Sequence, residues 1–600
     1  MKRSRLVAMA LALLGLGSAA AVYPIATSGA GAVSRAAESG GVANFAELVG
    51  GQITYIFPFL TCPADTSQNL GEFDNLLFAR LYTFDDGAKA SLNERTSLAY
   101  APTFSDKDTK VTVQLKPYKW SDGEAVDAQD VVFWQNLMTA NKKDYCTYVP
   151  GYYPDNIVSA KADGPTKVVF TLNHSYSPTW FLYNELSQIV PIPLAWDKTS
   201  STQTSNCAED ESDCVAVYNY LSSQASHLDT YATNPLWKVV DGPWALKSFS
   251  VNGTASFVPN RSFSGPDKPH LSQFNEVTFT STAAEYDALH AGTSIQVGYI
   301  PFVDAPAKGA PNPLGSGYQL ATWGIWGFGY IPMDEHNPTL GPVFKQTYFR
   351  QALEHLLDQT AVVQKLLRGY GSVGSGPIPT DVPDSFLTTS ALTRDPFPFD
   401  VAKAKSLLVS HGWDVKPSGV TTCGKPGTGM GECGAGIAKG TRLEINLVDA
   451  SAPPWIGQSM EDLKSVASEV GIKFNLSSQP ADTVIGDLTG SKWQMLDWGS
   501  PGWTYVPTVY PSGEDLFKTT GSENHSGYSS PELNALITAV ITKPGNQHLR
   551  AYDSYIRQQV PVLWQPTSAY QISEVATDLH GVVPQDPLDA ISPQDWYYTK

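Results

Sequence analysis

Apolar and polar residues alternate over residues 111–115, which predicts a strand with one buried face, because successive strand side chains point to opposite sides. Asp122 and Gly123 then supply turn chemistry. Beyond this turn the apolar residues recur at helical spacing, and Asp127 stands at the expected N-cap with Asp130 three residues later. The run VTVQLKPYKWSDGEAVDAQDVVFWQNL therefore predicts a strand, a turn and a capped helix, which are the parts of an α/β domain.

Similar patterns recur along the chain and predict further helices and strands. Residues 441–448 and 472–476 are predicted strands, with a helix at 458–470 between them. An acid or serine N-cap followed by a helical apolar stripe predicts further helices, which begin at Asp358, Asp400 and Ser530. Gly369 is placed to end the helix that follows Asp358.

The N-terminus has the pattern of a secretory signal peptide, assigned to residues 1–32. Lys2, Arg3 and Arg5 precede an apolar run at residues 6–16, and small residues follow. The run is shorter than the roughly 20 residues that a membrane-spanning helix needs, although an uncleaved anchor stays an alternative. No cysteine lies near the cleavage region for lipid attachment, so we expect an exported protein in the extracellular, cell-surface or periplasmic space.

Length and charge narrow the class of protein. With 600 residues the chain is long enough for more than one domain. The formal net charge of −18 argues against a general affinity for nucleic acid, because such binding needs basic patches.

Six cysteines in an exported chain favour disulfides. Cys207 and Cys214 bracket a short acidic loop, and Cys423 and Cys433 bracket a glycine-rich one, so each pair is predicted to be a local bridge. Cys62 and Cys146 then pair by elimination. Free or metal-bound thiols stay an alternative, but the cysteine spacings are not those of zinc sites, and we expect no bound metal.

Five runs of the sequence resemble the family 5 solute-binding proteins of ABC transporters, which bind peptides or nickel. They follow one another in the order that the family shows: the 111–137 run, GPWALKSFSVNGTASFVPNRSFSG from 242, AAEYDALHAGTSIQVGYIP from 283, YFRQALEHLLDQTAVVQKLLRGYGSVGSGPIP from 348 and DVAKAKSLLVSHGW from 400. One departure is Gln296, which stands where the family usually has an acid.

This resemblance implies an α/β, two-lobed periplasmic-binding-protein-like fold of type II, of the large cluster with an extra inserted subdomain, and with a cleft that closes at a hinge. The first lobe is expected to come from three separate segments of the chain. The expected division is 43–75 for the first segment of lobe 1, 76–184 for the inserted subdomain, 185–295 for the second segment of lobe 1, 296–505 for lobe 2 and 506–600 for the C-terminal segment of lobe 1.

Aromatic side chains are the expected lining of the cleft, because a binder of extended and varied solutes needs flat apolar faces. Glycine-flanked tryptophans are the stronger candidates, and core packing is the alternative for each ring. The candidates are Tyr55, Phe57, Phe59, Trp323, Trp326, Trp498, Trp503 and Tyr505.

The stretch Ser500-Pro501-Gly502 departs from the pattern of peptide binders resembling this chain, in which an acid there holds the free amino end of the peptide. Asp497 is the nearest acid. A buried ammonium without a carboxylate costs several kcal/mol, so peptide is the leading expectation while blocked peptides, sugars and other amphiphiles stay open.

The expected role is capture of a solute and delivery to a membrane permease of an ABC importer, by a monomer without cofactor or catalysis. A ligand sensor is one alternative, and a secreted hydrolase with a carboxylate pair is a more remote one. The sequence has no G-x-S-x-G, H-E-x-x-H or Walker A motif, and the G-x-G-x-x-G string at 429–434 lies between two cysteines without a preceding strand.

Overall fold

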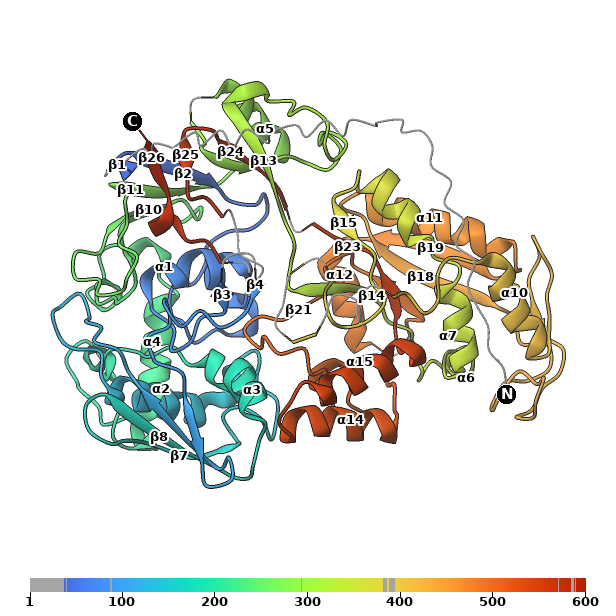
Figure 1. Cartoon of the computed structure of the whole chain (residues 1–600), viewed down its shortest axis with the longest axis horizontal. Helices are drawn as coiled ribbons and strands as arrows, with labels where there is room; N and C mark the ends of the chain where they lie inside the picture. Colours follow the sequence, from blue (N-terminus) through green and yellow to red (C-terminus); the bar gives the residue numbers. More distant parts are fainter. Residues whose placement is uncertain are drawn as a thin grey trace, which may run out of the picture.

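The computed structural model describes residues 37–599, apart from 39, 87–88, 293, 381, 383–385, 388–393, 491, 570, 584–587 and 589. The expected signal peptide, residues 1–32, lies outside the described residues. Among those described, every helix is too short or too polar to cross a bilayer. Figure 1 shows two lobes, with the chain up to β13 and the strands from β24 onward in one, and the elements from β14 to β20 in the other.

A seven-stranded mixed sheet forms the centre of the first lobe. Strand β2 runs parallel to its two neighbours, β11 and β12, and the outer pairs are antiparallel. The strands in spatial order are β13 (Tyr318–Trp323), β24 (Gln571–Ala576), β12 (Val297–Tyr299), β2 (Val42–Ala46), β11 (Gln273–Val277), β10 (Ala255–Pro259) and β9 (Trp244–Phe249). The sheet therefore joins the start, middle and end of the chain. A small sheet of β1 (Ala37–Glu38), β26 (Tyr597–Thr599) and β25 (Leu579–His580) pairs the first described strand with the last two.

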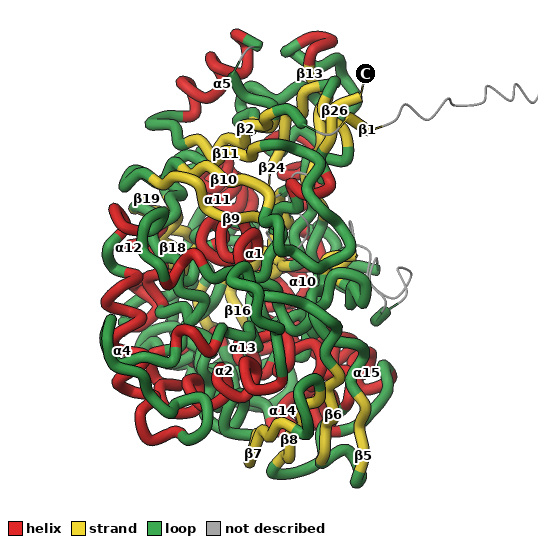
Figure 2. The backbone as a smooth tube through the Cα atoms, turned by 90° about the vertical axis from the view of Figure 1, so that its left-hand side faces the viewer, coloured by secondary structure: helices red, strands yellow, loops and turns green. Residues whose placement is uncertain are grey.

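The subdomain with the 111–137 run lies far from the seven-stranded sheet: Figure 2 shows β5 to β8 at the bottom of the view and β2, β11 and β24 near the top. Its four antiparallel strands are β5 (Thr103–Ser105), β6 (Lys110–Gln114), β8 (Lys167–Leu172) and β7 (Ile157–Ala162). Helix α2 (Ala128–Asn141) contacts β7 and β8, and α4 (Cys214–Ala225) contacts α2. The predicted cap is confirmed: Asp127 accepts from the backbone N–H groups of Gln129 and Asp130, and the Asp130 side chain accepts from the Asp127 N–H.

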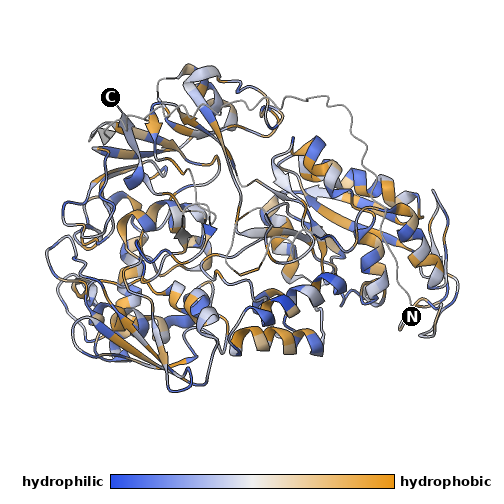
Figure 3. Ribbon diagram, in the orientation of Figure 1, coloured by the Kyte–Doolittle hydropathy of each residue, from blue (hydrophilic) through white to orange (hydrophobic). Residues whose placement is uncertain are grey.

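The second lobe is built on three parallel strands, β19 (Lys473–Gln479), β18 (Glu444–Ala450) and β20 (Met495–Asp497). Helix α11 (Trp455–Ser468) connects the first two, which confirms the predicted strand–helix–strand unit, with the first strand starting at Glu444. Figure 3 shows apolar and polar residues mixed in this lobe, and its buried core includes Ile445, Leu447 and Phe474 of these strands. The helices around them include α6 (Gly341–Phe344), α7 (Thr347–Glu354), α8 (Gln359–Ala361), α10 (Val401–Ser410) and α12 (Ala481–Gly486).

Two strand-to-strand connections join the lobes. The chain passes from β13 to β14 (Gly327–Ile331) and returns from β22 (Leu563–Gln565) and β23 (Thr567–Ser568) to β24. Since β13 pairs with β24 and β14 with β22, the two connections run antiparallel. The expected domain boundaries stay a prediction; strands β12 and β13, which that division gave to lobe 2, pair within the seven-stranded sheet.

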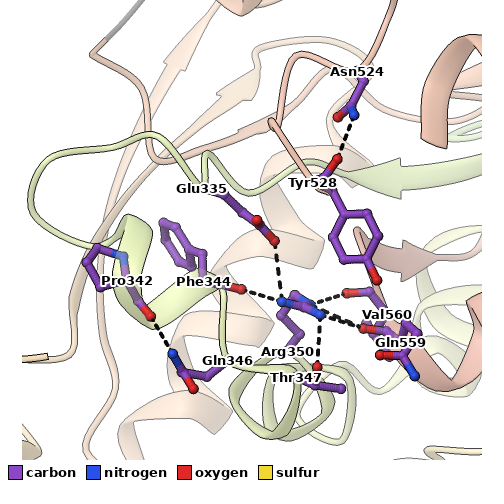
Figure 4. A network of polar contacts seen from close by, with 10 residues as sticks. All are labelled: Glu335, Pro342, Phe344, Gln346, Thr347, Arg350, Asn524, Tyr528, Gln559 and Val560. Atoms are coloured by element: carbon purple, nitrogen blue, oxygen red, sulfur yellow. Dashed lines mark hydrogen bonds and ion pairs between the residues drawn. The ribbon is translucent and has the colours of Figure 1, made fainter. Parts of the chain in front are cut away.

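Arg350 of α7 ties the second lobe to the end of α15 (Gln547–Gln559), as Figure 4 shows. Its Nε donates to the Val560 carbonyl at 2.8 Å, and its Nη2 donates to the Gln559 carbonyl at 3.0 Å. Val560 has φ 47°, so it ends the helix in the left-handed region and turns these carbonyls toward the guanidinium. The remaining partners are the Phe344 carbonyl, Thr347 and the carboxylate of Glu335.

All three predicted disulfides are present. Cys207 pairs with Cys214, Cys423 pairs with Cys433, and the long closure joins Cys62 to Cys146. The long bridge fastens the segment after β2 to the end of α2, so it connects the first segment of the chain to the subdomain.

Candidate functional site

Residues 503–510, here called the crossing segment, lie between the lobes, and Figure 1 shows β21 (Trp503–Thr504) in that position. Strand β21 pairs with β14, with Trp503 opposite Phe328 and Thr504 opposite Gly327. A side chain at Gly327 would place Cβ 2.2 Å from the Trp503 carbonyl, so only glycine allows this approach. Farther along, the Val509 N–H donates to the Tyr183 carbonyl at 3.0 Å, which brings the segment to the subdomain.

Three cavities border this segment. The largest, of about 120 Å³, is lined by Val506, Pro507 and Val509 together with apolar side chains of the first lobe. A second cavity, here called the Trp503 cavity, measures about 10 Å³ and is lined by Trp503, Tyr505, Asn184, Glu514 and Asp515 among others. The third, also about 10 Å³, includes Pro507 and Arg80. Since residues 503–510 contribute to all three, this segment is the centre of the candidate site.

Four of the eight candidate aromatics are only partly buried and keep accessible surface. They are Tyr55, Trp323, Trp498 and Trp503. Trp498 stands edge to face with Tyr330 at 5.1 Å between ring centroids, and Trp503 borders the cavity named after it. These four side chains have the partial exposure that a solute contact requires.

The other candidates from the first strand region belong to the core, which corrects the expectation for them. Phe57 and Phe59 are both 0% exposed. Phe57 packs near Trp196 and Trp237, and Phe59 lies 4.8 Å from Tyr218. These rings fill the interior of the first lobe, and we remove them from the proposed contacts.

Trp326 and Tyr505 are also buried, and their polar atoms hold the crossing segment in place. The Trp326 Nε1 donates to the Val509 carbonyl at 2.7 Å, and the Tyr505 hydroxyl donates to the Pro377 carbonyl at 2.6 Å. The Tyr505 N–H also donates to the Trp326 carbonyl. Trp326 is therefore structural, whereas Tyr505 both supports the segment and lines the Trp503 cavity.

Several buried polar atoms near the lobe connections lack a hydrogen-bond partner within the described part of the chain. They are the Trp323 Nε1 and both side-chain polar atoms of Gln571. Trp323 and Gln571 are cross-strand partners, so their side chains lie on one face of the β13–β24 pair. Buried polar groups normally find partners, so these atoms are available to a solute or water. Burial raises the pKa of Tyr55 to about 12, which keeps its hydroxyl protonated, and the nearby Ser222 side chain partly offsets this effect.

Asp497 does not replace the acid missing from residues 500–502. It is 0% exposed, and its Oδ1 accepts from the Gly499 N–H at 2.8 Å and the Gln565 Nε2 at 3.1 Å. Burial raises the pKa of Asp497 to about 6. The carboxyl therefore orders the turn after β20 rather than lining any of the three cavities.

Two acids that the sequence reasoning missed border the Trp503 cavity, Glu514 and Asp515 of α13 (Glu514–Phe517). The Oε1 of Glu514 accepts from the Trp180 Nε1 at 2.9 Å and the Asn184 Nδ2 at 3.2 Å. Burial raises the pKa of Asp515 well above its usual value, and the nearby Glu514 and Glu523 add to this effect. The sequence offered only the local signal Gly513-Glu514-Asp515, and acids at the start of a helix are normally solvated.

Comparison with known families decides the classification. The model of the bacterial extracellular solute-binding proteins, family 5, matches residues 95–522, which is more than half of the chain. This chain belongs to that family. Members of the family are solute-binding proteins. Separately, the described residues contain no group of three or more histidine, cysteine or acidic side chains that could hold a metal ion.

Individual relatives span most or all of the chain. The oligopeptide-binding protein AppA of Bacillus subtilis is 25% identical over the whole of both chains, and protein XP55 of Streptomyces lividans is 25% identical over 75% of this chain and 70% of its own. The structure of AppA in complex with a nonapeptide is similar in fold, with a TM-score of 0.63, 18% identity, and coverage of 94% of this chain and 100% of AppA. NikA of Brucella suis, in complex with Fe(III)-EDTA, shares the fold at a TM-score of 0.66 and 17% identity, with 93% and 100% coverage. These likenesses support the two-lobed α/β fold expected from the sequence.

Proposed function

We propose that this protein captures a peptide or peptide-like solute between its lobes and delivers it to the permease of an ABC importer. The full-length similarity to an oligopeptide-binding protein is the observation that carries this proposal. The partly exposed Tyr55, Trp323, Trp498 and Trp503 supply flat apolar faces, which suit a solute of varied side chains. The protein acts as a monomer and performs no catalysis itself.

Binding and closure are coupled in this account. A solute that touches Trp323 beside one lobe connection and Trp503 of the crossing segment makes contacts that only the closed arrangement completes. Ligand shifts the population toward closure by its difference in affinity for the two arrangements. The connection at 323–327, between the β13–β24 pair and the β14–β22 pair, is the short element that absorbs the motion. The permease then receives the closed, loaded protein.

Thermal unfolding in the presence of defined solutes tests the ligand class. We expect a pool of random nonapeptides to raise the Tm by about 2 °C, because a ligand at about 100 times its Kd stabilises the native state by about 2.7 kcal/mol and a long chain has a large entropy of unfolding. A matched pool of mono- and disaccharides is the comparison. A Tm raised by the sugars and unchanged by the peptides would overturn the peptide assignment.

Uptake separates import from sensing. In the native host, deletion of the gene should abolish accumulation of a labelled peptide that the purified protein binds. If uptake persists while the cells lose a response to the same peptide, the protein is a sensor.

A further inference from the structure

One end of the second lobe carries the opposite charge to the molecule as a whole. Residues 400–442, here called the basic end, contain six lysine and arginine residues against three acids, whereas the whole chain has a formal net charge of −18. The segment includes α10, β16 (Trp413–Asp414) and β17 (Thr422–Cys423), and Figure 1 shows α10 at the side of the lobe that lies away from the first lobe. A positive region on an acidic molecule indicates a negatively charged partner.

The lysines of the basic end are available to such a partner. Five of them are exposed, and none takes part in an ion pair of the described residues. They are Lys403, Lys405, Lys416, Lys425 and Lys439. Arg442 differs, because it pairs with Glu444.

Two of the three acids of the basic end are engaged by the backbone. Asp400 caps α10 by accepting from the Lys403 N–H at 2.9 Å, and Glu432 accepts from the Gly429 N–H at 2.6 Å. These bonds hold the two carboxylates against their own segments. The charge that the basic end presents outward is therefore mainly that of its lysines.

Two exposed apolar side chains lie on the same segment as these lysines. Met430, in the loop that the Cys423–Cys433 bridge closes, is fully exposed, and Val409 near the end of α10 is 54% exposed. A single exposed apolar side chain is common on soluble proteins. Exposed apolar side chains together with unpaired lysines are the composition of segments that lie in the interface of a membrane.

The disulfide loop lies against the end of α10, which joins the two parts of the segment into one surface. The Lys425 N–H donates to the Gly412 carbonyl at 3.0 Å, and a Cβ at Gly431 would lie 3.6 Å from the Ser410 carbonyl. Met430 and Val409 are the chain neighbours of Gly431 and Ser410. Lys405 is one helical turn before Val409 on α10, so it faces the same side.

Aromatic contacts behind the loop keep this surface in place. Tyr348 of α7 stacks on His411 with 3.7 Å between ring centroids, and the Trp413 Nε1 donates to the Tyr348 hydroxyl at 2.8 Å. The Tyr348 hydroxyl donates in turn to the Cys433 carbonyl. A loop that is already ordered loses little conformational entropy when it docks.

We propose that the basic end docks on the surface of an anionic lipid bilayer, with its lysines against the phosphate groups and Met430 at the boundary of the apolar layer. This goes beyond the capture of a solute and does not depend on which solute the protein binds. The acidic remainder of the chain is repelled by such a bilayer, so docking also orients the molecule with this end toward the membrane. For a protein that delivers its solute to a permease, the docking confines the search to the plane of the membrane.

Sedimentation of the full chain with lipid vesicles tests the docking. One set of vesicles contains phosphatidylglycerol and phosphatidylcholine in equal parts, and the other contains phosphatidylcholine alone, both at about 0.1 M salt. We expect binding to the anionic vesicles to be at least about tenfold tighter, because each lysine near an anionic surface contributes about fivefold.

Charge-reversal variants assign the effect to the basic end. Lys405→Glu combined with Lys425→Glu should weaken binding to the anionic vesicles by at least about tenfold. Lys143→Glu combined with Lys161→Glu makes the same change of net charge at exposed positions of the subdomain and should leave the binding unchanged. Every variant carries the same residues 1–36, so a difference between variants does not come from that segment.

A second pair of variants tests the contact of the loop tip. Met430→Ser should weaken binding to the anionic vesicles severalfold, because it removes apolar surface that the bilayer buries. Ile485→Ser removes an exposed apolar side chain from α12 of the same lobe and should bind normally. Equal binding by these two variants would remove Met430 from the proposed contact.

The contrary outcomes are distinct from failure of the solute-binding function. Equal sedimentation of the unmodified chain with anionic and neutral vesicles would overturn the docking, and this result does not depend on whether a variant folds. Binding retained in a folded Lys405→Glu and Lys425→Glu variant would also overturn it. Sedimentation only with vesicles that contain the permease would replace the bilayer by a protein partner and would contradict the proposal.

Discussion

Partly buried tryptophans are the residues at which solute binding can be separated from folding. Trp498 and Trp503 keep accessible surface, and their rings pack near those of Tyr330 and Tyr505, whereas Trp326 is fully buried. Removing a ring that is partly exposed leaves a smaller void than removing one from the core.

We therefore expect Trp498→Ala and Trp503→Ala to weaken binding of a peptide by about tenfold or more, as loss of an aromatic contact does at binding hot spots. Their Tm values should stay within a few degrees of the unmodified protein. Phe399→Ala, which removes an exposed ring elsewhere, is the control and should bind normally. Full affinity in both tryptophan variants would remove Trp498 and Trp503 from the site.

Arg350, in contrast to the two tryptophans, contributes to the stability of the fold and not to solute binding. The side chain is 2% exposed, and each of its nitrogens donates to a buried partner. A lysine carries the charge but not the planar set of donors.

Arg350→Lys should destabilise the protein strongly, by about 3–5 kcal/mol, because it leaves buried carbonyls and the Glu335 carboxylate poorly paired. Thermal unfolding measures this, with the exposed Arg442→Lys as the comparison. A Tm for Arg350→Lys within a degree of that of Arg442→Lys would contradict the role assigned to the network in Figure 4.

At the scale of elements, the sequence predicts features that depend on neighbouring residues, such as helix caps and the hydrophobic period of a strand or helix. Asp358, Asp400 and Ser530 each accept a backbone N–H three residues on, as their positions before apolar stripes indicated. A cap depends on a few neighbouring residues, so one sequence is enough to recognise it. The strand–helix–strand unit of the second lobe was predictable for the same reason, from its hydrophobic period.

Burial was not predictable where distant parts of the chain decide it. Phe57 is enclosed by Trp196 and Trp237, well over a hundred positions away in sequence. Glu514 is fixed by Trp180, at a sequence separation of 334. Neither contact leaves a periodic signal in the sequence. The sequence therefore could not separate aromatic residues of the core from those near the cavities, and it did not indicate the acids of α13.

The capping box of α2 provides a test at this scale. Asp127→Ala removes the acceptor for two backbone N–H groups and should destabilise the protein by about 1 kcal/mol, a modest fall in Tm. Asp127→Asn keeps an acceptor oxygen and should lose less. Equal Tm values for Asp127→Ala and the unmodified chain would show that the cap does not contribute to the stability of the subdomain.

At the scale of the whole molecule, buried acids determine how stability depends on pH. Burial raises the pKa of Asp130 and that of Glu285 to about 7. A carboxyl with a raised folded-state pKa stabilises the fold fully below its unfolded pKa, and that contribution is lost as pH rises through the folded value.

We therefore expect the Tm to be several degrees higher at about pH 5.5 than at about pH 8, since each unit of pKa shift is worth up to about 1.4 kcal/mol. Differential scanning calorimetry at constant ionic strength measures the change. A Tm that increases steadily from about pH 5.5 to pH 8 would contradict the assignment of these acids as buried and protonated.

The central claim is that the molecule as a whole is a carrier of peptide-like solutes, and native mass spectrometry of the protein purified without denaturation tests it most directly. The account predicts a mass above that of the chain and release of short peptides or peptide-like compounds on denaturation. Release of a sugar, a lipid or another compound without an amide backbone would contradict it.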